Sequence, residues 1–172
     1  MVNYYDGIAK GYDRLHGEEQ LTKLELIGRE INTDSTLKDF IKPTYKLLDV
    51  GCGTGISTAF FKVKDRVGVD PSKELIKIAI KNCPTCEFKV ETAEKLSFKD
   101  KQFEVVISLT AIQNFDDITT GLDEIRRVGK KYYILTFLKK SAKHSQIDTS
   151  IRLKFDVIKK IEEEKDIIYF CE

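Results

Sequence analysis

The sequence predicts one α/β domain built on a mostly parallel sheet. Strand-like and helix-like segments alternate from residue 46 to the end of the 172-residue chain, and such alternation favours parallel pairing with right-handed crossovers. The most apolar segment, FEVVISL at 103–109, has the composition of a strand buried on both faces of a sheet. A chain of this length can bury a core of its own.

The first 42 residues are predicted to form a helical region ahead of a core at 46–172. One helix is expected over 18–31, where apolar residues recur at helical spacing at Leu21, Leu24, Ile27 and Ile31. A second, short helix is expected over 36–41, with Ser35 as its cap.

Strands and helices are predicted to follow one another through the core. Strands are expected at 46–50, 66–70, 87–91, 103–109, 132–138 and 166–170. Helices are expected at 56–62, at 73–82, around the apolar stripe of Ile118, Leu122, Ile125 and Val128, and around Ile151, Phe155, Ile158 and Ile161.

The last segment is predicted to complete a sheet of six strands. Because a helix is expected between 132–138 and 166–171, these two strands should pair in parallel. The outer edge of 166–171 would then be open and apolar, and a second copy of the chain or a partner protein is expected to cover it.

Composition indicates a globular protein without a global charge bias. Hydrophobic residues make up 41% and charged residues 33% of the chain, and the net charge is +1. Bulk charge therefore attracts neither nucleic acid nor a membrane. No apolar run reaches the roughly 18 residues that cross a bilayer, and the N-terminus lacks the apolar centre of a secretory signal. The cytoplasm is the expected location.

The cysteines do not predict a metal site. Cys83 and Cys86 form one C-x-x-C pair, which is half of the ligand set of a structural zinc site. We expect two thiols in a turn, able to form a disulfide. Cys52 lies among glycines with no histidine nearby in sequence, so it is predicted to be a spacer rather than a nucleophile.

The segment LLDVGCGTGIST at 47–58 places three glycines at the end of a predicted strand. A phosphate-binding P-loop needs a lysine after the glycines, but Ile56 and Ser57 stand there. A dinucleotide-binding turn would have its third glycine where Ile56 stands. Asp70, at the end of the next strand, can accept hydrogen bonds from both hydroxyls of a ribose. The loop therefore predicts a ligand that contains a nucleoside, lies close to the backbone and does not need a pyrophosphate.

Four segments in order resemble the motifs of class I S-adenosylmethionine-dependent methyltransferases: LLDVGCGTG, VGVDPSKELI, VETAEKLSF and FEVVISLTAIQNF. The resemblance covers the chain from Tyr5 to Leu138, including the lead-in YYDGIAKGYDRLH. It implies one methyltransferase domain over 1–172 with residues 1–42 as a helical lid. The implied fold is a Rossmann-like three-layer sandwich with strand order 3-2-1-4-5 plus one C-terminal strand. The implied cofactor is S-adenosylmethionine, with no metal.

The resemblance also implies the residues that would hold the methionine part of the cofactor. Asp49 would bind its amino group, and Gly51, Gly53 and Gly55 would let the backbone approach this part and the ribose. Leu109, at the end of the fourth strand, would lie near the reacting sulfonium.

A second group of residues would hold the nucleoside part. Asp70 would bind the ribose hydroxyls, with Pro71 and Leu75 shaping the adenine side. Ala93 would offer its N–H to adenine. The preceding residue is threonine where the family often has aspartate, so that contact is expected either to be weaker or to be made by Glu94 instead. Asp70 as a helix cap and Glu94 as a solvated acid are the simpler alternatives.

The methyl acceptor is left open between a small molecule and RNA. Gln113, Asn114 and Tyr12 are the acceptor-side candidates, although the first two fit equally well as caps of the next helix. The segment TAIQ resembles ribosomal RNA guanine methyltransferases, and RNA is also favoured by Lys130, Lys131, Lys139, Lys140 and Lys143, which equally fit a solvated face. The alternative to an active enzyme is a silent cofactor-binding module or a subunit of a methyltransferase complex.

Overall fold

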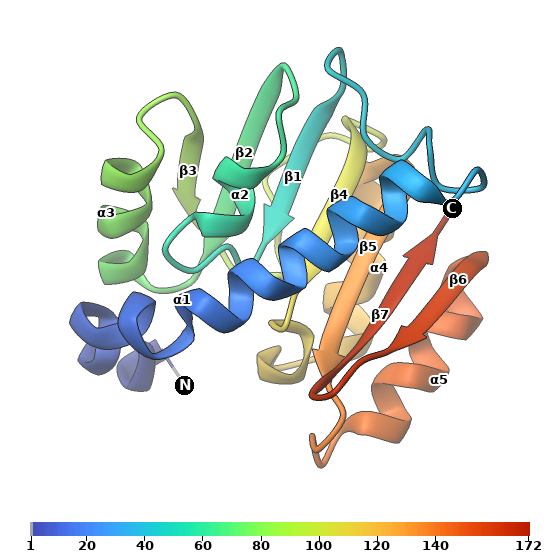
Figure 1. The fold of residues 1–172 in the computed structure, drawn as a ribbon. Helices are drawn as coiled ribbons and strands as arrows, with labels where there is room; N and C mark the ends of the chain where they lie inside the picture. The colour runs from blue at the N-terminus through green and yellow to red at the C-terminus, as the bar shows by residue number, and fades with distance from the viewer. Residues whose placement is uncertain (1) are drawn as a thin grey trace.

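The computed structural model describes the backbone of residues 2–172 and the side chains from Gly17 onward. A seven-stranded sheet in the order β3-β2-β1-β4-β5-β7-β6 lies between two layers of helices (Figure 1). Neighbours from β3 to β5 pair in parallel, and β7 is antiparallel to both β5 and β6. The strands are β1 Lys46–Val50, β2 Asp65–Asp70, β3 Glu87–Val90, β4 Phe103–Leu109, β5 Gly129–Leu138, β6 Val157–Glu162 and β7 Asp166–Cys171. The predicted three-layer sandwich with the order 3-2-1-4-5 is confirmed.

The helices divide between the two faces of the sheet (Figure 1). On one face lie α1 Val2–Thr33, α2 Ile56–Phe60 and α3 Lys73–Asn82, with α1 running obliquely across the strands. On the other face lie α4 Ile118–Val128 and α5 His144–Lys154. A single 3-10 turn, η1 Ile112–Asn114, follows β4.

Strand β4 separates two apolar cores, because alternate side chains of a strand point to opposite faces. Val105 and Ile107 are buried with Ile27 of α1 in one core. Val106 is buried with Leu122 of α4 in the other core. The prediction that 103–109 is buried on both faces is confirmed, and its carboxyl end is held rigidly beside the site described below.

The region between α1 and β1 does not contain the predicted helix over 36–41. Residues 35–39 form successive turns instead. The Asp34 carboxylate accepts hydrogen bonds from Thr36 N (2.9 Å) and Thr36 Oγ1 (2.7 Å), a local turn that competes with a helical start. Asp34, rather than Ser35, is the residue that organises this segment.

The C-terminal region contains a hairpin that the sequence pattern did not predict. The helix expected through Ile161 ends at Lys154, and β6 follows it. Residues 163–165 turn the chain back into β7, and so short a connection requires antiparallel pairing. Strand β6 is parallel to β5 but does not lie next to it. Strand β7 lies between them and pairs with both in antiparallel orientation. The predicted pairing of 166–171 with 132–138 is therefore confirmed, whereas the predicted number of six strands and the parallel orientation are wrong.

At the C-terminal side of the sheet, the edge strand is β6 rather than residues 166–171. Every residue of β7 is buried, so the apolar edge expected to recruit a second copy or a partner does not exist at that place. The observed edge carries Lys159 and Lys160 and a register shift between Val157 and Lys159, and both features disfavour pairing with another strand.

Cys83 and Cys86 form a disulfide across the turn that ends α3, with their Cα atoms 5.4 Å apart. The predicted turn with two thiols able to pair is confirmed. Within the described residues, no helix combines the length and apolarity needed to cross a membrane.

Candidate functional site

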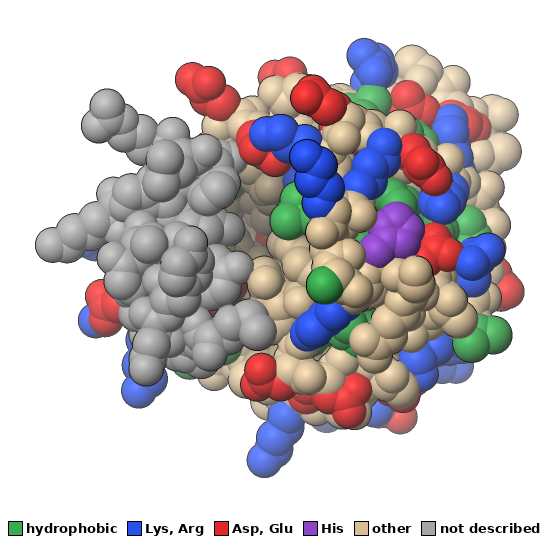
Figure 2. Space-filling model, turned by 90° about the horizontal axis from the view of Figure 1, so that it is seen from below, with side chains coloured by type: hydrophobic (Ala, Val, Ile, Leu, Met, Phe, Trp, Pro, Cys, Tyr) green, Lys and Arg blue, Asp and Glu red, His purple; other side chains and the backbone are tan. Residues whose placement is uncertain are grey.

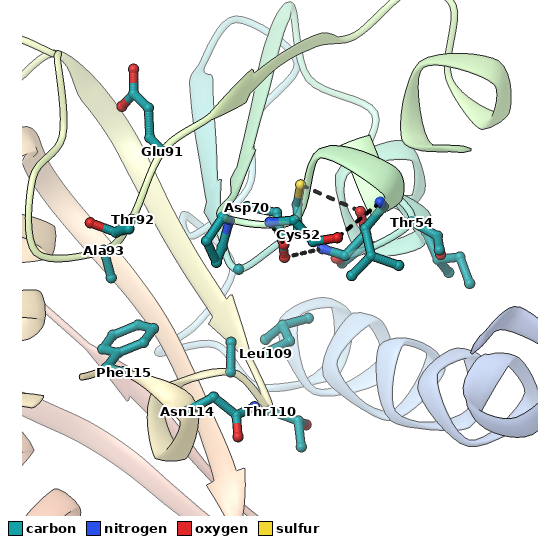
Figure 3. A pocket seen from close by; sticks show the side chains of 18 of the residues that line it. Cys52, Thr54, Asp70, Glu91, Thr92, Ala93, Leu109, Thr110, Asn114 and Phe115 are labelled. Carbon is teal, nitrogen blue, oxygen red and sulfur yellow. Dashed lines mark hydrogen bonds between the residues drawn. The ribbon is translucent and has the colours of Figure 1, made fainter. Parts of the chain in front are cut away.

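A cleft lies at the carboxyl ends of the parallel strands, where the strand order reverses between β1 and β4 (Figure 3). The loops after β1, β2, β3 and β4 form its walls, together with Gly17 and Gln20 of α1. Ligands of open α/β sheets bind at this position. The cleft gathers, among the residues predicted from sequence, Gly51, Gly53, Asp70, Pro71, Leu75, Ala93, Glu94, Leu109 and Asn114.

The three glycines after β1 all have left-handed backbones, with φ of 77°, 55° and 81° at Gly51, Gly53 and Gly55. A Cβ on Gly51 would lie 2.4 Å from the Cβ of Ala111, so this glycine lets the loops after β1 and β4 meet. A Cβ on Gly55 would lie 3.2 Å from the Cα of Ala79 in α3. Gly55 does not line the cleft; its role is to pack the loop against α3.

Asp70 ties the glycine loop to the start of α3. The residue is 7% exposed and lines the cleft. One carboxylate oxygen accepts a hydrogen bond from Gly53 N (2.9 Å) and the other accepts one from Ser72 N (2.9 Å). Ser72 caps α3 by accepting a bond from Leu75 N (3.2 Å), so Asp70 is not the helix cap. A carboxylate is thereby fixed on the cleft wall at the end of β2.

Asp49 is fully buried and lies behind the cleft wall rather than on it. Its Oδ2 accepts hydrogen bonds from Ser57 Oγ (2.6 Å) and Thr58 Oγ1 (2.7 Å), and Ser57 lines the cleft. Its Oδ1 has no hydrogen-bond partner among the described residues. Burial raises the pKa of Asp49 to about 6, and the nearby Asp70 adds to the rise, whereas the two hydroxyls oppose it.

The raised pKa of Asp49 predicts an unusual pH dependence of stability. Because the folded pKa of about 6 exceeds the usual 3.8, ionisation of Asp49 destabilises the fold fully above pH 6, and the penalty disappears as the pH falls towards 4. Asp49→Asn removes that penalty, which is on the order of 2–3 kcal/mol. We expect the variant to exceed the wild type in melting temperature at pH 8 and the difference to shrink at pH 4. A difference independent of pH would contradict this assignment.

Cys52 lines the cleft but lacks the properties of a nucleophile. Its side chain is buried, and burial raises the pKa of the Cys52 thiol well above its usual range, with Asp49 and Asp70 adding to the rise. The thiol therefore stays protonated at neutral pH. This environment supports the prediction that Cys52 is a spacer in the glycine loop.

The expected adenine end of the cleft is bounded by Pro71, Leu75 and Ala93. Glu94 also lines it, but its Oε1 accepts hydrogen bonds from Asp116 N (2.8 Å) and Asp117 N (3.2 Å). Glu94 thus connects the loop after β3 to the loop after β4. The structure gives this carboxylate a bracing role that the sequence pattern did not indicate.

The other end of the cleft is formed by the loop that follows Leu109. Thr110, Asn114 and Phe115 line it (Figure 3), and so does Ala111. Gln113 is not among the lining residues, because its Nε2 donates to the carbonyl oxygen of Thr110 (2.7 Å).

The structure decides one of the two remaining acceptor-side expectations. Asp117 caps α4 by accepting a bond from Thr120 N (3.1 Å), so the alternative that Gln113 or Asn114 caps this helix is wrong. The Tyr12 side chain lies outside the described residues.

Behind this end of the cleft lies a buried polar cluster that the sequence analysis missed. Lys23 of α1 and Asp166 of β7 form an ion pair (2.6 Å) with side chains only 3% and 0% exposed. Burial raises the pKa of Asp166, and Lys23 opposes the rise. Lys23 also donates to the hydroxyl of Thr110, whose backbone is left-handed with φ of 57°. Such a backbone costs a residue with a side chain roughly 1–2 kcal/mol.

A signal for Lys23 was present in the sequence. It lies four residues before Ile27 and therefore in phase with the buried face of α1. Leu21, which was expected on that face, is 46% exposed. Asp166, by contrast, begins the apolar run DIIYF, but nothing in the sequence identifies Lys23 as its partner.

The five lysines that favoured RNA do not gather at the cleft. Lys130 and Lys131 stand at the amino end of β5, the opposite end of the sheet. Lys139, Lys140 and Lys143 follow its carboxyl end, where Lys143 Nζ donates to Phe115 O (2.9 Å). On the face viewed in Figure 2, Lys and Arg side chains are interspersed with Asp and Glu side chains. Among the described residues that line the cleft, the charged ones are all acidic: Asp70, Glu91, Glu94 and Asp116.

Comparison with known proteins adds independent information. Residues 48–136 match the model of a family described as a methyltransferase domain. An uncharacterised protein of Methanocaldococcus jannaschii is 36% identical over 139 residues, which are 80% of this chain and 50% of that protein. A demethylmenaquinone methyltransferase of Chlorobaculum parvum is 39% identical over 88 residues, which are 49% of this chain and 36% of that enzyme.

A solved structure from Thermotoga maritima has the same fold. It is described as a SAM-dependent methyltransferase and possible histamine N-methyltransferase. It superposes with a TM-score of 0.72 at 19% identity, over 99% of each chain. The present chain spans about half or less of the length of the curated relatives named above.

Proposed function

The chain belongs to the methyltransferase domain family, and from this membership we propose that its cleft binds S-adenosylmethionine and that the protein transfers the methyl group to an acceptor. The observation that carries the proposal is the left-handed glycine loop held at Gly53 by Asp70, at the point where the strand order reverses. The glycine loop exposes backbone without side chains on one wall of the cleft, and the Asp70 carboxylate is fixed beside it. This arrangement suits a ribose and the methionine part attached to it.

The residues present fit this cofactor at both ends of the cleft. Asp70 supplies the acceptor for ribose hydroxyls, and Pro71, Leu75 and Ala93 supply a partly apolar wall for a base. Asp49 places negative charge behind Ser57 with one oxygen unpartnered, which favours a nearby ammonium group. Leu109 would border the sulfonium. These residue roles are part of the proposal.

Once bound, S-adenosylmethionine supplies a methyl group that is already activated by its sulfonium. The chain therefore has to align the acceptor and exclude water rather than generate a strong nucleophile. The loop from Thr110 to Phe115 and the turn of α1 at Gly17 and Gln20 form the walls available for that task. Asn114, whose side chain can donate and accept hydrogen bonds, is the acceptor-side residue that the cleft retains.

We further propose that the acceptor is a small molecule that is neutral or positively charged. The charged side chains among the described lining residues are acidic, and their field repels a polyanion such as RNA. Two of the lysines that favoured RNA lie at the opposite end of the sheet.

A labelled-methyl assay tests the proposal. The protein is incubated with methyl-labelled S-adenosylmethionine and with separated metabolite, RNA and protein fractions. We expect label in the metabolite fraction alone, with Asp70→Ala as the inactive control. Label in RNA would contradict the proposed acceptor class. Cofactor binding without transfer to any fraction would support the silent module instead of the enzyme.

A further inference from the structure

We propose that the buried ion pair of Lys23 and Asp166 is a positioning device, which sets the acceptor end of the cleft by fixing Thr110 in its left-handed backbone. This inference rests on the proposed function, because it concerns the end of the cleft where the methyl group would be presented. Lys23 and Asp166 do not line the cleft, so they act through Thr110, which does.

The contacts converge on Thr110 from three other elements. From α1, Lys23 Nζ donates to the Thr110 hydroxyl. That hydroxyl lies 3.1 Å from Asp166 Oδ1 at the start of β7, to which it donates. In β5, Thr136 Oγ1 and the Thr136 carbonyl oxygen lie 2.7 and 3.1 Å from Thr110 N. A strained backbone persists only where its surroundings determine it in this way.

The backbone of Thr110 determines where the next residues lie. Ala111 follows it directly and packs at the place where Gly51 lacks a side chain. Leu109 precedes it, and Asn114 lies one short turn beyond. A change at Thr110 would therefore move the residues that border the methyl group and the acceptor together.

The ion pair of Lys23 and Asp166 also fixes α1, which forms another wall of the cleft. Gln20 lies one turn before Lys23 on α1 and lines the cleft, as does Gly17 one turn earlier. Breaking the pair would release this part of α1 and the Thr110 loop at once. An apolar pair could fill the same space with a smaller desolvation cost, which favours a role in specifying one arrangement over a role in stability alone.

The test measures three ligands that reach different distances along the cleft. Adenosine, S-adenosylhomocysteine and S-adenosylmethionine are titrated into the wild type, Lys23→Met and the charge-neutral double variant Lys23→Met with Asp166→Asn. We expect S-adenosylmethionine affinity to fall about tenfold in both variants, while adenosine affinity changes by less than about twofold. General loosening of the fold would weaken all three ligands alike.

A matched control and a milder variant complete the design. Lys159 also joins α1 to the C-terminal hairpin, but its ion-pair partners are Glu30 (2.8 Å) and Asp34 (2.7 Å), neither of which lines the cleft. Lys159→Met should therefore leave all three affinities unchanged. If the Lys23 variants fail to fold, Thr110→Gly tests the same point without separating the buried ion pair, and should show the same selective loss.

The outcomes separate the inference from the function. Unchanged ligand ratios in Lys23→Met and Thr110→Gly would overturn the inference while leaving cofactor binding intact. A wild-type protein that binds none of the three ligands would overturn the proposed function and the inference with it.

Discussion

Asp70→Ala is expected to abolish measurable binding of S-adenosylmethionine while leaving the protein folded. The substitution removes the carboxylate proposed to bind the ribose hydroxyls, and it also releases Gly53 N, which Asp70 holds at 2.9 Å. Charge-assisted hydrogen bonds contribute on the order of 1.5–3 kcal/mol each, so the loss of two lowers affinity by about a hundredfold or more. Calorimetric titration measures the affinity, and circular dichroism confirms the fold.

Two variants make this result specific. Asp70→Asn keeps the shape of the side chain but loses its charge, so it should bind more weakly than wild type and better than Asp70→Ala. Asp65→Ala changes the half-buried acid at the opposite end of the same strand, where its carboxylate lies 3.8 Å from Lys46 Nζ, and should bind normally. Unchanged affinity in Asp70→Ala would contradict the assignment of Asp70 as the residue that binds the ribose hydroxyls.

Gly53→Val is expected to destroy binding by occupying space that the backbone leaves open. Gly53 lines the cleft and has φ of 55°, a conformation that a β-branched residue adopts only at a cost of roughly 1–3 kcal/mol. The variant should therefore melt at a lower temperature and bind no cofactor.

Gly53→Asn separates the effect of backbone strain from the effect of a side chain that occupies the cleft. Asparagine tolerates a left-handed backbone, but its side chain still occupies the cleft. We expect the asparagine variant to keep most of its stability and to lose binding. Normal affinity in Gly53→Asn would show that no ligand approaches the chain at this point.

The parallel core was predictable because its signals are local. Most strands from 46–50 to 132–138 are short runs rich in apolar residues that a helical pattern follows, and the glycine loop marks the first turn. The cofactor-side residues could be assigned for the same reason: Asp70 and the glycines lie at strand ends, and the carboxyl ends of parallel strands meet at one edge.

The C-terminal hairpin was not predictable from its pattern alone. The spacing of Ile151, Phe155, Ile158 and Ile161 fits one face of a helix. In the structure, Ile151 belongs to α5 and Ile161 belongs to β6. Tertiary pairing with β7 decides this segment, including backbone hydrogen bonds of 2.9 Å in both directions between Asp156 and Glu172.

The ion pair behind the cleft was missed because its partners lie far apart in sequence. Lys23, Thr110 and Asp166 come from α1, the end of β4 and the start of β7. Placing Asp166 required the antiparallel strand that the sequence analysis did not expect. Charged side chains are seldom fully buried unless they are paired, so a single lysine in phase with an apolar stripe indicates a buried partner without identifying it.

Titration of the wild-type protein with S-adenosylmethionine, with adenosine as competitor, tests the central proposal most directly. We expect one saturable site per chain, displacement by adenosine, and no heat of binding with Asp70→Ala. Absence of binding by the folded wild-type protein at cofactor concentrations up to about 1 mM, a weak affinity for a cofactor, would contradict the assignment of this cleft to S-adenosylmethionine.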